Sequence, residues 1–516
     1  MVKKKISELK LRDFFYRIFV TMKRLLFVYC LIHFFPSNCW SQSVFNKIYY
    51  ADSPLTGAAR ANAVIQTSDN GFLIAGTTKN ALVMYVIKTN NLGDTLWTFH
   101  YDLGPGGGDI ISTAIETNDS NYVIGGVTRD TGIPSSSAFL IKLSASGNII
   151  WVRTFGLLSL SERCYDVKQT PDGGFVFCGL RFNTSGSDCD VYLVKTDTAG
   201  YPLWEKTFGG TNYDYGNSIE LTSEGGYMIF GTTYSYGVGS YNMYLIKTDS
   251  LGNMLWQNTY GGSSEDYGNS IAKTSDGNYV LAGGTFVSID TIAAYVLKVD
   301  TSGAIIWQKR YKGSIKAEEF NAVKTLPTGE VVVSGDEQAD SLNYRYYGIA
   351  KKLDVNGDAI WEKEYKYFNT DTTQHYFYAM DLASDGGYVM AGMTIDLHYG
   401  ASPTNEMWMV KTDSLGCDNA SCLLTTSIST NGVLKKEEVL IYPNPFCISS
   451  TIEITIEPNI KYDFILYDQF GRVVKEIMNI TEKKTIIQKN DLDSGMYFYK
   501  AISTGNIIGT GKILVN

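Results

Sequence analysis

A tryptophan that returns about every fifty residues constrains this chain more than any other feature. Its spacings run from 51 to 54 residues, and it occupies Trp97, Trp151, Trp204, Trp256, Trp307 and Trp361. A lysine stands nine residues before each tryptophan, and a further lysine, Lys411, has no tryptophan after it. A fixed period of this length indicates a repeat fold in which every copy is one small structural unit.

Each copy predicts four short strands joined by tight turns. In the fifth copy these are SIAKT (270–274), YVLAG (279–283), AYVLKV (294–299) and IIWQKRY (305–311), all rich in β-branched or aromatic residues. Turns such as Ser-Asp-Gly-Asn fit antiparallel hairpins. Four antiparallel strands per repeat are typical of one blade of a β-propeller, with the tryptophan packed between sheets.

The seventh copy lacks its fourth strand, and a segment near the N-terminus can replace it. VFNKIYY (44–50) aligns with LWEKTFG (203–209), so that Phe45 stands at the tryptophan position. Pairing of this segment with the last copy would remove two open sheet edges. We therefore predict an all-β chain whose residues 42–417 form a seven-bladed β-propeller, closed by its N-terminal strand.

Residues 1–41 have the pattern of a secretory signal peptide, with Met22 as an alternative start. Basic residues precede the apolar run 25–35, and Cys39 and Ser41 are small residues suited to a cleavage site. The run is too short for a stable membrane span, so no transmembrane anchor is expected in the mature chain.

The net charge of the chain limits the classes of partner that we expect. The whole chain carries a net charge of −9, although residues 1–41 hold eight basic and two acidic residues. The remainder is therefore more acidic still, which argues against nucleic acid and anionic membranes as partners.

The cysteines suit an exported chain, in which disulfides can form. Cys417 and Cys422 enclose a short loop and are the first candidates for a disulfide. Cys164 and Cys178 lie on neighbouring predicted strands and are a second candidate pair. The alternative is that these residues are small, buried and unpaired.

The pattern changes after the propeller. Residues 418–437 are polar and rich in Ser and Thr, as in a linker. Residues 438–516 then alternate apolar and polar positions, for example at Ile452, Ile454 and Ile456, and predict a small Ig-like β-sandwich.

Four motifs carry a resemblance for this module: YPNPF (442–446), LYDQFGRVV (466–474), LDSGMYFYKA (492–501) and GKILVN (511–516). Together they resemble the type A C-terminal sorting domain of the type IX secretion system of Bacteroidetes. The resemblance implies Sec export, passage across the outer membrane by that machinery, and removal of the module with release or surface attachment. An ordinary accessory Ig-like domain is the alternative.

The propeller repeats are similar to kelch-like and Asp-box-like repeats of secreted bacterial propellers. The turn with Asp249 and Gly252 departs from the Asp-box, because two residues rather than one separate the aspartate from the glycine. This resemblance implies a fold and no particular site.

An acid recurs at the start of the first strand of most copies. These candidate ligand-binding residues are Asp109, Glu162, Asp214, Asp266 and Glu318, with His375 in the seventh copy and Ala59 in the first. Since the first strands line the channel of a propeller, the acids could ring its mouth and hold a cation, for which Ca²⁺ is the candidate. The alternative is that each accepts hydrogen bonds from loop amides of its own blade.

The connections between second and third strands vary most from copy to copy and are rich in Tyr, Ser, Asn and Asp. Variable loops on a rigid scaffold often carry binding specificity. Tyr213 and the Tyr-Ser-Tyr triplet centred on Ser235 are therefore further candidates for ligand contact. Solvated loops without a ligand are the alternative.

Catalysis has little support in the sequence, which contains no GxSxG, HExxH or P-loop motif. The enzyme alternative is a secreted, sialidase-like glycoside hydrolase with Glu162 and Asp214 as its carboxylate pair. The favoured prediction is a secreted or cell-surface binding or adhesion protein, whose ligand is an extracellular glycan or protein.

Overall fold

The computed structural model of the chain describes eighteen segments. They are 43–50, 59–78, 83–104, 108–129, 136–156, 160–183, 188–288, 291–311, 317–338, 345–367, 373–396, 404–419, 439–446, 448–454, 461–468, 472–489, 492–503 and 506–515. These residues form β-strands, turns and connections, and no α-helix occurs among them. Residues 42–425 and the residues that follow 425 belong to two separate compact units. The expected signal peptide lies outside the described residues.

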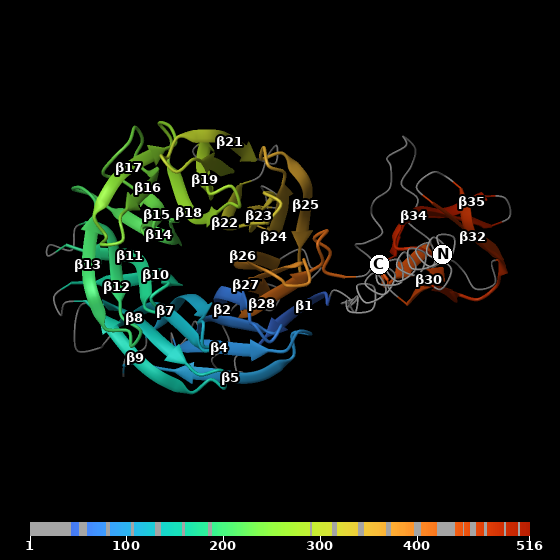
Figure 1. Ribbon diagram of the computed structural model, residues 1–516, viewed down its shortest axis with the longest axis horizontal. Helices are drawn as coiled ribbons and strands as arrows, with labels where there is room; N and C mark the ends of the chain where they lie inside the picture. The colour runs from blue at the N-terminus through green and yellow to red at the C-terminus, as the bar shows by residue number, and fades with distance from the viewer. Residues whose placement is uncertain are drawn as a thin grey trace, which may run out of the picture. The chain divides into compact units, whose positions relative to one another are not determined.

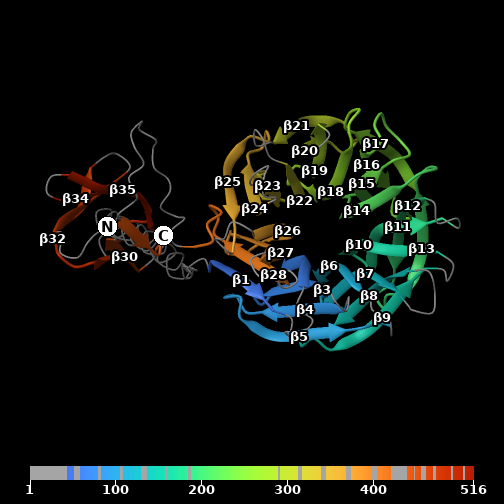
Figure 2. The same ribbon diagram turned by 180° about the vertical axis from the view of Figure 1, so that it is seen from behind.

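The first unit is built from small antiparallel sheets of four strands, one sheet for each sequence repeat (Figure 1). The innermost strands in Figures 1 and 2 are the first of each repeat. They are β2 (Ala59–Gln66), β6 (Ile110–Glu116), β10 (Glu162–Gln169), β14 (Asp214–Leu221), β18 (Asp266–Lys273), β22 (Glu318–Thr325) and β26 (Thr373–Leu382).

The second and third strands form the buried middle of each sheet. The second strands are β3 (Phe72–Thr78), β7 (Tyr122–Arg129), β11 (Phe175–Phe182), β15 (Tyr227–Thr233), β19 (Tyr279–Ser288), β23 (Val331–Gln338) and β27 (Tyr388–Asp396). The third strands are β4 (Met84–Thr89), β8 (Ser136–Leu143), β12 (Cys189–Thr196), β16 (Asn242–Thr248), β20 (Thr291–Val299), β24 (Tyr346–Leu353) and β28 (Thr404–Thr412).

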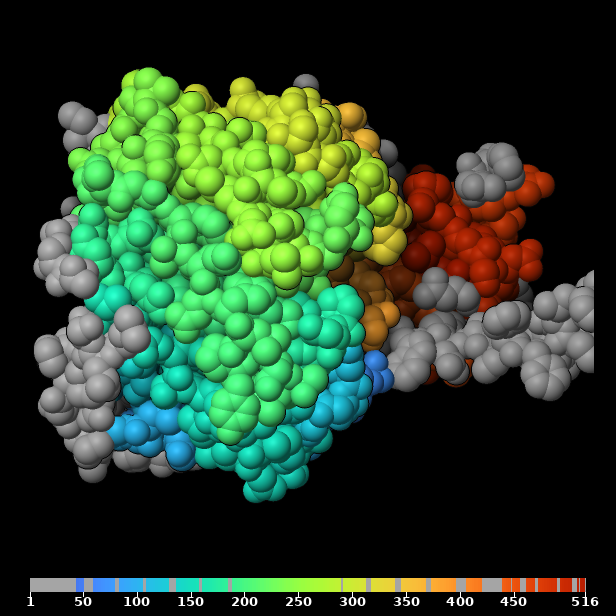
Figure 3. Space-filling view, turned by 60° about the vertical axis from the view of Figure 1, so that its left-hand side comes forward, coloured from blue at the N-terminus to red at the C-terminus, as the bar shows by residue number. Residues whose placement is uncertain are grey.

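The fourth strands are outermost and bear the repeated tryptophans (Figure 2). They are β5 (Thr95–Tyr101), β9 (Ile149–Phe155), β13 (Pro202–Phe208), β17 (Met254–Tyr260), β21 (Ile305–Tyr311) and β25 (Ala359–Tyr365). Figure 3 shows successive repeats side by side in chain order on the surface, from blue through green to yellow.

Each tryptophan packs against the following sheet. Trp204 lies 5.9 Å from Tyr227 between ring centroids, and a side chain at Gly252, whose φ is +75°, would come within 2.6 Å of the indole. A left-handed backbone with no room for a Cβ requires glycine at that turn. This contact explains why tryptophan and the turn glycine recur together.

The N-terminal strand β1 (Phe45–Tyr49) pairs antiparallel with β28, with Phe45 opposite Lys411 and Tyr49 opposite Met407. Phe45 lies against Gly93, the turn glycine of the first repeat, just as each tryptophan lies against the turn glycine of the repeat that follows it. Phe45 and Tyr49 also share one buried cluster with residues of β2–β4 and β27–β28. A single parallel pair, Tyr346–Gln374, joins the sixth and seventh repeats into an eight-stranded sheet.

Asparagines at a bulge connect the first strands of neighbouring repeats. Each lies where the register shifts, and its Nδ2 donates to a backbone carbonyl of the next first strand. The bonds are Asn62–Ile111 (2.6 Å), Asn217–Gly268 (2.7 Å), Asn269–Phe320 (3.1 Å) and Asn321–Phe377 (2.9 Å). Gln66 of β2 likewise donates its backbone amide to Asp381 Oδ2 of β26 (3.0 Å).

The second unit consists of two small antiparallel sheets around one core. One sheet has the order β29 (Val439–Tyr442), β30 (Ser449–Ile454) and β33 (Lys484–Gln488). The other has the order β32 (Val473–Ile480), β31 (Tyr462–Tyr467), β34 (Gly495–Ser503) and β35 (Asn506–Val515). Alternate residues such as Ile441, Ile452, Leu466 and Tyr499 fill the core between them, as period-two alternation requires.

Candidate ligand-binding site

The repeated acids lie inside the sheets. None of the five exposes more than 1% of its surface. Three of them accept a hydrogen bond from a backbone amide in the connection that leads into their strand: Leu103 N to Asp109 Oδ2 (2.6 Å), Gly210 N to Asp214 Oδ2 (2.8 Å) and Gly262 N to Asp266 Oδ2 (2.8 Å). This is the loop-anchoring role that the sequence allows as the alternative to a cation ring.

The other members of the series have partners of their own. Glu162 accepts from Arg181 Nε (3.1 Å), and Glu318 pairs with Lys351 Nζ (2.7 Å). Burial raises the pKa of Glu318 to about 7 although Lys351 opposes this shift. His375 is fully buried, and its Nδ1 lies 2.9 Å from the hydroxyl of Thr394.

These positions form neither the cation ring that was one of the two interpretations of the sequence nor an exposed acid pair. Among the described residues, no group of three or more His, Cys, Asp or Glu side chains is arranged to hold a metal ion. Glu162 and Asp214, the carboxylates of the glycosidase alternative, are both fully buried. Glycoside hydrolysis needs its two carboxyl groups open to substrate and water, and burial denies these two that access.

The residue that follows each member of this series, Ala59 and His375 included, points to the opposite face of the strand and is partly or well exposed. The first strands are the innermost of each sheet (Figure 2), so these residues lie on the strands nearest the centre of the unit. In repeat order they are Arg60, Ile110, Arg163, Tyr215, Tyr267, Glu319 and Tyr376. Repetition did not reveal them, because their residue types differ from repeat to repeat. The signal available was the simple alternation of strand residues.

Six aromatic residues of the fourth and fifth repeats form what we call the aromatic patch: Tyr213, Tyr215, Tyr234, Tyr241, Tyr267 and Phe286. Ring centroids are 6.3 Å apart for Tyr213–Tyr215, 4.9 Å for Tyr234–Tyr241, 5.4 Å for Tyr241–Tyr267 and 6.0 Å for Tyr267–Phe286. All six are partly or well exposed, and Tyr234 exposes 41% of its surface. The patch includes Tyr213 of the sequence-based candidates.

Ser235, another sequence-based candidate, has a supporting role beneath the patch. Its hydroxyl donates to Asp214 Oδ2 (2.7 Å) and accepts from the amide of Asn212 (3.1 Å). The buried acid of the fourth repeat thereby fixes both loops that bear the tyrosines. Most other variable loops fall in the gaps between described segments, so their expected part in binding stays a prediction.

Next to the patch lies a pair of carboxyl groups that we call the acidic pair, Glu319 and Asp336. The two residues are direct cross-strand partners on β22 and β23. Asn269 donates to Glu319 (2.8 Å) and Asn321 donates to Asp336 (3.1 Å). Among the described residues, no lysine or arginine forms an ion pair with either carboxyl group.

Burial, with the charge of Glu319 as a second cause, raises the pKa of Asp336 to about 8, while Asn321 opposes the shift. Burial also raises the pKa of Glu319. Two neighbouring carboxyl groups without a cation do not both ionise readily. The pair can therefore hold a proton near neutral pH.

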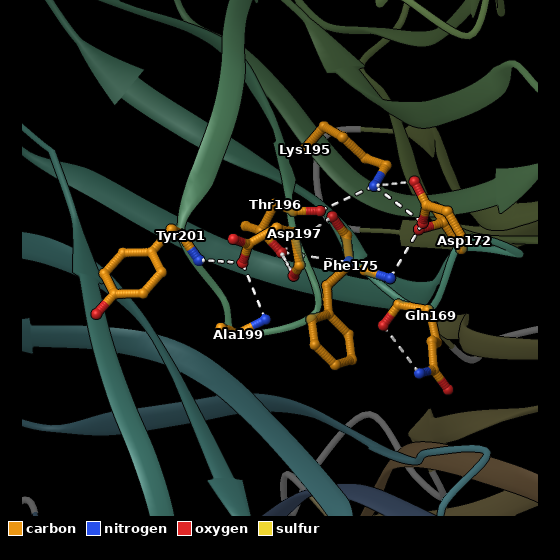
Figure 4. Close-up of polar contacts among 11 residues, drawn as sticks. Gln169, Asp172, Phe175, Lys195, Thr196, Asp197, Ala199 and Tyr201 are labelled. Atoms are coloured by element: carbon orange, nitrogen blue, oxygen red, sulfur yellow. Dashed lines mark hydrogen bonds and ion pairs between the residues drawn. The ribbon is translucent and has the colours of Figure 1, made fainter.

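The repeated lysines have a structural role. Figure 4 shows Lys195 of the third repeat reaching Asp172 in the turn between β10 and β11 (2.9 Å), while it also donates to Thr196 O (2.8 Å). Equivalent pairs are Lys88–Asp69, Lys142–Asp119, Lys298–Asp276, Lys352–Glu330 and Lys411–Asp385. In six of the seven repeats the lysine therefore ties the third strand to a turn of its own sheet, whereas Lys247 of the fourth repeat donates to Thr301 O of the next repeat (3.4 Å).

The two cysteine predictions have different outcomes. Cys164 and Cys178 are free thiols, so their predicted pairing is wrong. They lie on adjacent strands but point to opposite faces, since each packs in a different core cluster. Cys417 is disulfide-bonded and buried. Cys422 lies outside the described residues, and its pairing with Cys417 stays a prediction.

Comparison with known families assigns the C-terminal module. Residues 440–516 match the family described as the secretion system C-terminal sorting domain. This match indicates a protein that is secreted or attached at the outer cell surface. Within the described residues, no helix has the length and apolar character needed to cross a membrane.

For the repeat region, the comparisons are weaker. An uncharacterised WD repeat-containing protein of Acanthamoeba polyphaga mimivirus is 20% identical over 296 residues, which cover 40% of this chain. The match spans about a fifth (21%) of the length of that relative.

Similar solved structures include an α-L-arabinanase from Penicillium chrysogenum complexed with arabinobiose, with 12% identity, coverage of 72% of this chain and 98% of the other, and a TM-score of 0.40. The α-L-arabinofuranosidase of Fusarium graminearum has 9% identity, the same coverage and a TM-score of 0.38. Sqt1 from Chaetomium thermophilum has 9% identity, coverage of 72% and 91%, and a TM-score of 0.37. These likenesses assign no activity.

Fold, site and module together define the class: an exported all-β repeat protein made of four-stranded sheets, with a partly exposed aromatic patch on its fourth and fifth repeats. Its C-terminal module is a sorting domain of the type IX secretion system.

Proposed function

We propose that residues 42–417 form a closed, seven-bladed β-propeller of kelch-like type, and that it binds an extracellular glycan at the aromatic patch. The proposal places the protein on or outside a Bacteroidetes cell, as a binding or adhesion component. Pairing of β1 with β28, and the contact of β2 with β26, support closure of the ring.

The aromatic patch is the observation that carries the binding proposal. Aromatic rings with an exposed face stack on the apolar faces of sugar rings, while their hydroxyl groups bond to sugar hydroxyls. Neighbouring rings such as Tyr234, Tyr241 and Tyr267 lie about 5 Å apart and are tilted by only 31°. They offer a continuous platform rather than an interdigitated core.

Polar groups around the platform favour a glycan over an apolar protein surface. Glu265 accepts from Tyr267 Oη (2.5 Å) and from Ser240 Oγ (3.2 Å), so the rim can bond to sugar hydroxyls. A protein ligand would instead match a larger apolar area with a polar rim. The loops that bear Tyr213 and Tyr234 are held by hydrogen bonds through Ser235, which reduces the entropy lost on binding.

Glycan-array binding of the mature chain tests this proposal. We expect Tyr241→Ala to weaken binding about tenfold, since an aromatic contact contributes up to about 1.5 kcal/mol. Tyr201→Ala is the matched control, because Tyr201 is 56% exposed and contacts Arg153 away from the patch. Equal binding by both variants, with unchanged melting temperatures, would exclude the patch as the site.

A glycoside hydrolase is the second candidate function. For this function the acidic pair is better suited than Glu162 and Asp214, the pair named from the sequence. Unlike Glu162 and Asp214, Asp336 is partly exposed, and a carboxyl group that stays protonated near neutral pH is what a general acid requires. Release of reducing sugar from a bound glycan, lost in Asp336→Asn, would support this candidate. Binding without hydrolysis would leave the protein as a lectin-like component.

A further inference from the structure

One face of the C-terminal module is apolar and open. On the four-stranded sheet, Val473, Met496, Phe498 and Leu514 expose 50%, 48%, 45% and 38% of their surfaces. They belong to β32, β34 and β35, the strands on both sides of β31. The opposite face of this sheet is the buried core, so these side chains form the outward face.

The strand register places these side chains together. Phe498 is the direct partner of Tyr467 on one side and of Lys512 on the other, and Tyr467 is the partner of Val473. Met496 and Leu514 are partners in the next row on the same face. Directly opposed residues have their Cβ atoms about 5 Å apart, which makes the patch continuous.

The other sheet of the module has a different outward face. Tyr442 Oη donates to Glu453 (2.6 Å), and Lys484 pairs with the same carboxylate (3.1 Å). Ile486, which is 60% exposed, stands among these polar groups. Both sheets of the module turn a hydrophobic face to the core. Their outward faces differ, since one is polar and the other is largely apolar.

Exposed contiguous apolar surface is rare in proteins without a partner for it. Lys500 and Lys512 lie on the same face, and no acid among the described residues forms an ion pair with either of them. A suitable occupant is thus a protein surface with an apolar centre and acidic groups at its rim. Because this module matches a secretion system sorting domain, a protein of the export machinery is the occupant that we consider.

We propose that the outward face of β32–β31–β34–β35, centred on Phe498, is the surface by which a protein of the export machinery recognises this module. The polar sheet plays no part in that contact. This inference is independent of the glycan-binding proposal, because it concerns export alone.

The test compares secretion of full-length variants in a host that has the type IX system. We expect Val473→Ser, Phe498→Ser and Leu514→Ser combined to lower the fraction outside the cell at least tenfold, with accumulation in the periplasm. Ile486→Ser on the polar sheet is the matched control and should be exported normally. Exposed positions of this kind change stability little, so folding should persist. Normal export of the triple variant, or an equal defect in the control, would overturn the proposal.

A photo-crosslinking residue at position 498 of the full-length chain identifies the occupant. A crosslink to a protein of the export machinery would support the proposal. A crosslink to residues 42–425 of the same chain, or to lipid, would show that another surface covers this face, and would overturn it.

Discussion

The contacts between successive sheets and the groups at the centre of the same unit follow opposite rules. Within and between sheets, one set of contacts recurs: a tryptophan on a turn glycine, a lysine on a turn acid, and an asparagine on the next strand's carbonyl. At the centre, the seven equivalent positions hold two arginines, three tyrosines, a glutamate and an isoleucine. The scaffold is therefore encoded by repetition, and the candidate site by departure from it.

Deletion of residues 43–50 should destabilise the protein more than any single substitution in the repeats. It leaves β28 as an open edge and removes Asn46, whose Oδ1 accepts from Trp408 Nε1 (2.7 Å). We expect loss of cooperative unfolding and aggregation, since an unpaired edge strand templates association. Calorimetry and size-exclusion chromatography measure this. A monomer that melts as the parent does would show that β1 is not part of the scaffold.

Lys411→Ala tests the repeated lysine tie where it is most buried. Lys411 and Asp385 expose only 1% and 14% of their side chains, so the change leaves a carboxylate without its lysine in a mostly buried position. We expect a loss of about 3 kcal/mol in the free energy of unfolding. Lys411→Met with Asp385→Asn should recover most of it, because no charge remains. Denaturant titration compares the three proteins, and equal losses in both variants would contradict a charge effect.

Asp336→Asn tests the acidic pair through pH. Because the folded-state pKa of Asp336 is raised to about 8, its protonated form stabilises the fold below about pH 4, and this contribution is lost as pH rises toward 8. The variant should therefore be more stable than the parent at pH 8, by about 1 kcal/mol or more, and equal to it near pH 4. Melting temperatures from pH 4 to 9 provide the measurement. A pH-independent difference would mean that Asp336 titrates normally.

Phe286→Ala is expected to have the smallest effect, and it marks the border of the aromatic patch. Phe286 contacts Tyr267 edge-on at 6.0 Å and has no hydroxyl for a sugar. We expect glycan affinity to fall by about threefold, while the melting temperature changes little. A loss of affinity as large as that of Tyr241→Ala would show that Phe286 on β19 contacts the glycan directly.

The strands and the packing of the tryptophans between sheets could be predicted from the sequence, but the lysine and asparagine contacts and the exposed residues of the first strands could not. Asp214 and Tyr215 are adjacent, and both types are plausible in a binding site. Repetition drew attention to the aspartate, which the connection before β14 covers. Nor could spacing reveal the acidic pair, because Glu319 and Asp336 meet only through the β22–β23 register. For the cysteines, neighbouring strands were correctly inferred, but opposite side-chain faces were not.

The amino-acid sequence by itself determined the period, the four strands of each repeat and the exported character of the chain. These follow from local alternation, turn chemistry and a family motif, all of which act over short stretches of chain. Tertiary structure decided which face of each first strand is covered, which rings from two repeats form one platform, and which sheet of the module stays apolar outside. Those outcomes depend on which residues pack against each strand, and these residues are far away in the sequence.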